Sequence, residues 1–180
     1  MEIIFPDHYY FHYHAPNADE FMERLNGCGT WMISNSDFPW VRDCDVDVIR
    51  LEWEKWYNFL TPSLQLLSKD ISDKIGIDNI EYSLCDPWMN LYKKGGFQEI
   101  HDHKDADIAS VFFLQNDDHF YFHNRNANLG TIWRQPDRQY MKGKKGDIIF
   151  FPAHMLHGVT PNRNETIRKT FSCNLWIRTQ

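Results

Sequence analysis

Turn-forming residues divide the second part of this sequence into short apolar segments, and this pattern limits the fold more than any other feature. Valine, isoleucine and aromatic residues dominate these segments, which is typical of β-strands. Asn116, Gly146 and Pro161 lie in polar stretches that suit turns, and the stretch at Asn116 suits a hairpin. Many short strands with regular turns predict a β-sandwich or barrel. The segments expected to be strands span residues 80–91, 109–115, 119–123, 147–151 and 168–178.

The part of the chain before residue 80 has apolar residues at helical spacing. Residues 17–26 resemble a short helix that Asn17 can cap and Gly27 can end. A longer stretch over residues 46–77 has mostly the same helical spacing. Pro62 interrupts this stretch, so we expect two helices there, with Thr61 as the cap of the second.

Composition disfavours several classes of protein. The chain has 180 residues, which suits one domain with a proper core. Its formal net charge of −6 argues against nonspecific binding to nucleic acid. No apolar run approaches the ~20 residues that span a membrane, and the first residues lack the pattern of a secretory signal. The four cysteines form no CxxC pair, as expected for reduced thiols in a cytoplasmic protein.

Three potential metal ligands, His101, His103 and Asp105, alternate shortly before an apolar segment. Alternate residues of a strand point to one face, so these side chains share a face if the segment is extended. A further ligand must come from a distant segment, where FFPAHMLHGVTPN supplies His154 and His157. Two histidines and a carboxylate on one face of a metal favour a non-haem Fe(II) centre. The competing interpretation is a solvated strand edge with a polar residue at every second position.

Three segments in order resemble a known family: WMNLYKKGGFQEIHDHKDADIASVFFL, GDIIFFPAHMLHGVTPN and IRKTFSCNLW. They are similar to the 2-oxoglutarate/Fe(II) oxygenases found in bacteria and marine phages. That family has an Asn before a Gly-containing turn, an H-x-H at a strand start and a G-D-x-x-x-F-P turn. A distal His and an Arg near the start of the last strand follow. The resemblance extends over about residues 88–176, and the ordered set is more specific than any single piece.

The resemblance implies a metal centre of His101, His103 and His157, in which all three ligands are imidazoles. A second register stays open, because most oxygenases of the wider superfamily carry H-x-D and this chain also offers that pattern from His103. Asp105 would then be a ligand in place of His101; in the first register it can instead orient a ligand. His157 is favoured over His154 because the distal ligand of the family follows the F-P turn, just before the chain re-enters a strand.

The same resemblance assigns a role to Arg168, which follows the distal histidine. In the family, an Arg at this place grips the far carboxylate of 2-oxoglutarate. The guanidinium fork suits that task, since it can make two parallel hydrogen bonds to a carboxylate. Thr170 faces the same way on the expected strand and can add a hydroxyl donor. Asn90 and Tyr92 share a face of another expected strand and are further candidate contacts of the cosubstrate.

We therefore expect a mainly β (α+β) chain that folds as a double-stranded β-helix, a cupin-like jelly-roll, with N-terminal helices packed outside. A single domain would span residues 1–180, with a helical or mixed part at 1–79 and a jelly-roll core at 80–180 that carries the metal site. The expected function is a dioxygenase that uses Fe(II), 2-oxoglutarate and O2 to hydroxylate an unidentified substrate, releasing succinate and CO2. The alternative is a cupin-like metal- or sugar-binding module without turnover, which would not need Arg168 and Thr170.

Overall fold

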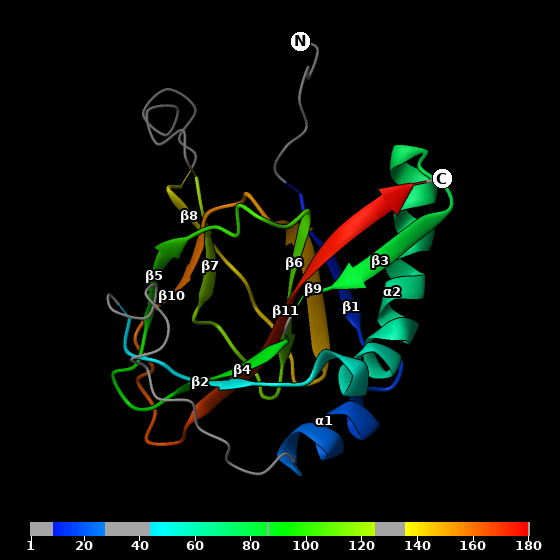
Figure 1. Cartoon of the computed structure of the whole chain (residues 1–180). Helices are drawn as coiled ribbons and strands as arrows, with labels where there is room; N and C mark the ends of the chain where they lie inside the picture. The colour runs from blue at the N-terminus through cyan, green and yellow to red at the C-terminus, as the bar shows by residue number, and fades with distance from the viewer. Residues whose placement is uncertain (1–8, 28–43, 86, 125–135, 180) are drawn as a thin grey trace.

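Two antiparallel β-sheets form a jelly-roll in the computed structural model, which describes residues 9–27, 44–85, 87–124 and 136–179 (Figure 1). The large sheet has the strand order β1-β9-β6-β11-β4-β2, and β3 pairs with the far part of β11. The small sheet has the order β5-β10-β7-β8 and lies on the left in Figure 1. The predicted fold class is confirmed.

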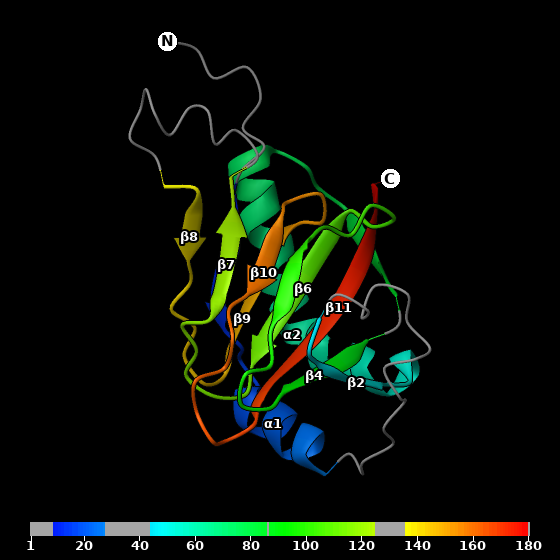
Figure 2. The same cartoon turned by 90° about the vertical axis from the view of Figure 1, so that its left-hand side faces the viewer.

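The bounds of the strands follow the chain. The large sheet contains β1 (Phe11–His14), β2 (Asp47–Arg50), β3 (Ile80–Leu84), β4 (Trp88–Tyr92), β6 (Ile108–Phe113), β9 (Asp147–Pro152) and β11 (Arg168–Thr179). The small sheet contains β5 (Gln98–His101), β7 (Phe120–His123), β8 (Arg138–Tyr140) and β10 (His157–Val159). Strand β11 runs between β6 and β4 and is therefore central in the large sheet (Figure 2).

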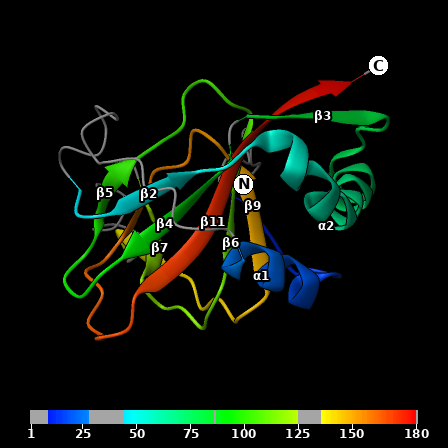
Figure 3. The ribbon, with the colours of Figure 1, turned by 60° about the horizontal axis from the view of Figure 1, so that its bottom comes forward.

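Two helices, α1 (Ala18–Asn26) and α2 (Trp53–Ile75), lie on the outer side of the large sheet (Figure 3). Their apolar faces join one face of the sheet in a single core. Phe21 of α1, for example, packs against Phe112 of β6 and Phe171 of β11, with ring centroids 4.5 and 5.0 Å away. Among the described residues, neither helix combines the length and apolar character needed to cross a membrane.

Helix α2 continues through Pro62, so the predicted division into two helices is wrong. Trp56, Leu60 and Leu64, on either side of the proline, are all buried in the same core. A proline inside a helix removes one hydrogen bond and costs about 3 kcal/mol. Continuous burial of this apolar stripe offsets that cost. The helix ends at Gly76, whose φ of 76° lets its N–H reach the carbonyl groups of the last turn.

Parts of the N-terminal half belong to the sheet, which the helical spacing did not predict. Residues 47–50 form β2, where Val48 faces the space between the sheets and Ile49 faces the helices. Two buried residues on opposite faces are typical of a strand covered on both sides. The expected hairpin at Asn116 is also wrong, because this stretch connects β6 of the large sheet to β7 of the small one.

Candidate active site

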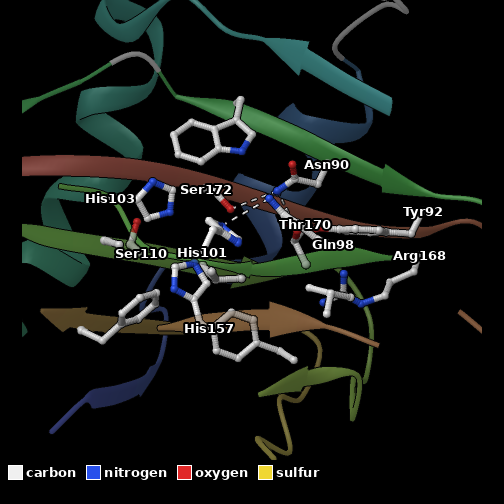
Figure 4. Close-up of a pocket in the computed structure, with 16 residues that line it drawn as sticks. Asn90, Tyr92, Gln98, His101, His103, Ser110, His157, Arg168, Thr170 and Ser172 are labelled. Atoms are coloured by element: carbon white, nitrogen blue, oxygen red, sulfur yellow. Dashed lines mark hydrogen bonds between the residues drawn. The ribbon is translucent and has the colours of Figure 1, made fainter. Parts of the chain in front are cut away.

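Three histidines meet between the two sheets (Figure 4). His101 ends β5, His103 follows two residues later, and His157 begins β10, where it lies opposite His101 in the ladder. One nitrogen from each ring lies within 4.8 Å of the others, and within the described part of the chain this is the one group of three or more potential ligands. The ring centroids of His101 and His157 are 4.2 Å apart.

Hydrogen bonds to the backbone fix how two of these rings can present their nitrogens. Nδ1 of His101 donates to the carbonyl oxygen of Glu99 at 2.8 Å, and Nδ1 of His157 donates to that of Met155 at 2.9 Å. A neutral imidazole with a proton on Nδ1 carries its lone pair on Nε2. Both rings therefore present an unprotonated nitrogen that can bind a metal.

His103 has a different partner, the side-chain amide of Asn174, whose nitrogen lies 3.4 Å from Nδ1. The Asn174 oxygen is buried and has no hydrogen-bond partner within the described residues. Oxygen and nitrogen of an amide exchange places on rotation by 180°. That rotation would give the His103 Nδ1–H an acceptor and leave Nε2 of the third ring unprotonated as well.

All three imidazoles favour the neutral form. Burial lowers the pKa of His101, although its backbone hydrogen bond opposes the shift. Burial, with the neighbouring His101, lowers the pKa of His103 to about 4. Burial and the two other histidines hold the pKa of His157 well below its usual range. Protons therefore do not compete with a metal for these nitrogens at neutral pH.

The alternative ligands lie elsewhere. Strand β5 ends at His101, and Asp105 is exposed in the turn that follows, where its backbone oxygen accepts a hydrogen bond from Trp176 Nε1 at 2.5 Å. Its carboxylate is not part of the three-histidine group. His154 is also exposed and lines a separate groove beside α2 and β11. The structure thus brings together His101, His103 and His157, and neither of these two alternatives.

Arg168 begins β11 and lines the same pocket as the histidines, although its side chain is almost fully buried. Its Nε donates to the carboxylate of Asp117, and its guanidinium lies 4.5 Å from the centre of the Tyr92 ring. The two terminal nitrogens, Nη1 and Nη2, are buried without a hydrogen-bond partner among the described residues. Buried donors without partners are rare in proteins, so this pair indicates a place for an acceptor.

Asp117 is a site residue that the sequence did not predict, because its stretch resembled an ordinary turn. Its carboxylate is buried and also accepts a hydrogen bond from the backbone N–H of His119 at 2.8 Å. The carboxylate thus holds one edge of Arg168 while the other edge stays free. Sequence spacing offered no signal for this pair, since 51 residues separate its members.

The wall between Arg168 and the histidines is polar. Asn90 Nδ2 lies 3.3 Å from the hydroxyl oxygens of both Thr170 and Ser172, and the Asn90 oxygen is buried without a described partner. Burial raises the pKa of Tyr92 to about 12, so its hydroxyl keeps its proton. That hydroxyl donates to the side-chain oxygen of Gln98 at 2.7 Å. Apolar residues close the pocket from the other side, among them Val111, Phe120, Phe151 and Val159.

The donor set fits the cofactors expected from the sequence. Three neutral imidazoles can hold Fe(II) on one face and leave its other positions free for small ligands. The free edge of Arg168 matches a carboxylate. A dicarboxylic keto acid is therefore a suitable second occupant of the pocket.

Comparison with known proteins gives a consistent picture. Residues 86–174, about half of the chain, match the family model described as "Putative 2OG-Fe(II) oxygenase". No curated protein sequence gives a significant match. Among solved structures, a 2OG-Fe(II) oxygenase family oxidoreductase from Burkholderia pseudomallei has 16% identity and a TM-score of 0.64, with 93% of this chain and 84% of that chain covered.

Two further structures have the same fold. A prolyl-4-hydroxylase from Pseudomonas putida has 14% identity and a TM-score of 0.59, with 95% of this chain and 92% of that chain covered. HygX from Streptomyces hygroscopicus, solved with nickel and 2-oxoglutarate bound, has 10% identity and a TM-score of 0.58, with 93% and 82% covered. At such low identities these likenesses concern the fold.

Proposed function

Since residues 86–174 place this chain in the 2OG-Fe(II) oxygenase family, we propose that it hydroxylates an organic substrate with Fe(II) held by His101, His103 and His157. 2-Oxoglutarate would occupy the pocket that these histidines share with Arg168. When bound, the iron and keto acid supply the oxidation of a substrate C–H by O2, with release of succinate and CO2. The primary substrate is an unidentified organic molecule.

The free edge of the Arg168 guanidinium is the observation that carries this proposal. A metal-binding module needs the three histidines but has no use for a buried arginine whose terminal nitrogens face a pocket. Leaving such donors without partners costs about 1–3 kcal/mol each. A carboxylate bound across both nitrogens would remove that cost and would add directional, charge-assisted hydrogen bonds.

Each wall of the pocket has a task in this scheme. Arg168 and Thr170 bind the far carboxylate, and Asp117 holds the guanidinium so that its free edge faces the pocket. The unpartnered oxygen of Asn90 can accept a hydrogen bond from a ligand. The apolar side limits the access of water, which strengthens the electrostatic interactions inside. Since three neutral imidazoles leave the full charge of the metal uncompensated, the centre attracts an anionic cosubstrate.

The proposal also places the protein in the cytoplasm of a bacterial cell, or of one that a phage has infected. The three described cysteines, Cys44, Cys85 and Cys173, form no disulfide. Thiols of this kind fit a reducing compartment. The net charge of −6 gives no support to nucleic acid as the general partner.

The test is an anaerobic titration of the purified protein with Fe(II) and then 2-oxoglutarate. We expect a weak visible charge-transfer band that appears only when both are present, and succinate release after O2 is admitted. Arg168→Lys should weaken the band at a fixed keto acid concentration, whereas Arg178→Lys, on the exposed end of the same strand, should not. If wild-type protein binds Fe(II) and gives neither band nor succinate, the function is that of a cupin-like binding module.

A further inference from the structure

Gln98 has a side chain that connects the candidate cosubstrate wall to the metal centre. It lies on β5, three residues before His101, and is buried. Its oxygen accepts the hydrogen bond from Tyr92, and its nitrogen lies 3.3 Å from Nε2 of His101. Because the protonated tyrosine hydroxyl donates to the amide oxygen, the orientation of the amide is fixed. The NH2 group must therefore point toward His101.

In the structure the Gln98 amide donates to the same nitrogen that a metal would take. Nδ1 of His101 is the donor to Glu99, so Nε2 carries the lone pair and accepts from Gln98. A lone pair cannot serve a metal and a hydrogen-bond donor together. Once a metal is bound to His101, the buried N–H of Gln98 needs a different acceptor close to the metal. A buried donor left without one would be costly.

The position of Gln98 decides which acceptor this is. Figure 4 shows Arg168, Tyr92, Gln98 and His101 in sequence along one side of the pocket. The guanidinium of Arg168 packs on the Tyr92 ring, and the Tyr92 hydroxyl contacts Gln98. A dicarboxylic keto acid that reaches from Arg168 to the metal would lie along these residues. Its second carboxylate, next to the keto carbon, then lies beside the Gln98 amide.

We propose that Gln98 is a binding residue for the cosubstrate, whose side-chain N–H donates to the carboxylate adjacent to the keto group. Tyr92 is a positioning residue, since its hydroxyl keeps the amide nitrogen directed toward the metal centre. A metal-bound carboxylate has one oxygen off the metal with lone pairs to satisfy, and the amide supplies a donor for it. This inference rests on the function proposed above and adds a contact at the near end of the keto acid, opposite to Arg168.

The test compares two keto acids on the Mn(II)-loaded protein, with affinities measured by anaerobic calorimetry. 2-Oxoglutarate has both carboxylates, whereas 2-oxobutyrate lacks the far one. Gln98→Met keeps the length of the side chain and removes the donor, and we expect it to weaken both keto acids by about tenfold. Arg168→Lys should weaken 2-oxoglutarate much more than 2-oxobutyrate. Gln65→Met, on the exposed face of α2, is the matched control and should change neither.

Tyr92→Phe provides a second route, because it removes the hydroxyl and keeps the ring under Arg168. It should weaken both keto acids by about threefold, and its effect should be non-additive with that of Gln98→Met. Mn(II) affinity should be unchanged in all four single variants. Unchanged affinity for both keto acids in folded Gln98→Met, or in Tyr92→Phe if the first variant does not fold, would overturn the inference. Failure of wild-type protein to bind 2-oxoglutarate would instead overturn the proposed function.

Discussion

The two faces of the large sheet are built from the same strands but serve different ends. Along β11, Phe171, Cys173 and Leu175 face the helices and are completely buried in an apolar core. The intervening residues Arg168 and Thr170 are equally inaccessible, yet they face the pocket between the sheets. Strand alternation thus lets one segment stabilise the fold with every second residue and form a binding site with the others.

The difference lies in how well each face satisfies its own groups. On the helix side, aromatic rings such as those of Phe21 and Phe112 fill the space against one another. On the pocket side, buried polar atoms of Trp88, Asn90 and Arg168 have no partner within the described residues. Departures of this kind from full satisfaction are expected at functional sites, where stability is given up for binding. Substitutions on the two faces should therefore affect different properties.

The largest effect on stability is expected from Phe171→Ala on the helix face. Removing a fully buried aromatic side chain costs about 3–5 kcal/mol, and Phe171 has 0% exposure and contacts both Phe21 and Trp56. Urea unfolding followed by circular dichroism measures the loss. The folded fraction should still bind one equivalent of Fe(II) with wild-type affinity. Phe171→Leu, a milder variant, should show a smaller loss with the same separation; weakened metal binding in it would break the comparison.

On the pocket face, Arg168→Lys should have the opposite profile. Lysine keeps the charge but cannot place two donors across a carboxylate, so about 1.5–3 kcal/mol of binding to 2-oxoglutarate should be lost. The dissociation constant should rise by about ten- to a hundredfold at fixed metal, as titration calorimetry would measure. Arg178→Lys, exposed on the same strand, is the control. Equal affinity in the two variants would remove Arg168 from the site.

A smaller effect is expected at Asp147, a polar residue between the sheets that lies outside the pocket and contacts β1. Its carboxylate accepts hydrogen bonds from His12 at 2.8 Å, His14 at 3.1 Å and the Lys144 N–H at 3.0 Å. Burial alone would raise the pKa of Asp147, but the hydrogen bonds from Lys144 and the two histidines outweigh it, and the pKa lies below 3.8. Ionisation therefore contributes stability that is complete above this value and is lost as pH falls through the lower, folded pKa.

Asp147→Asn should accordingly lower the free energy of unfolding by about 1 kcal/mol at pH 7. The difference from wild type should shrink once pH falls below the folded pKa. Chemical unfolding across a pH series measures both quantities. Asp118→Asn, whose side chain is 83% exposed, should have little effect at any pH. A deficit for Asp147→Asn that persists unchanged in acid would show that shape, and not charge, gives Asp147 its role.

The strands that the sequence predicted are those buried on both faces. Strands β6 and β9 consist of six consecutive buried residues each, and such continuous apolar runs are easily recognised. Strands β5 and β10 were missed because they are short and carry site residues in place of apolar ones. Strand β8 is mostly exposed, so it left no apolar signal. The continuity of α2 was also unpredictable, since only tertiary packing outweighs the local effect of Pro62.

The candidate site followed from spacing wherever two functional residues share one strand. Arg168 with Thr170, and Asn90 with Tyr92, alternate along single strands, and the structure places all four in the pocket. Asp117 could not be found in this way, because its partner lies on a distant strand. Gln98 is also three residues from His101, and only the end of the strand between them lets the two side chains meet.

The iron content of His101→Ala and Asp105→Ala tests the central claim most directly. The structure groups His101 with His103 and His157 and leaves Asp105 exposed in the following turn. Each purified variant would be loaded anaerobically with Fe(II), separated from free metal and assayed, with circular dichroism to confirm folding. The account predicts a His101→Ala protein without iron and an Asp105→Ala protein with one iron per chain. Full iron occupancy in His101→Ala together with an iron-free Asp105→Ala would contradict it.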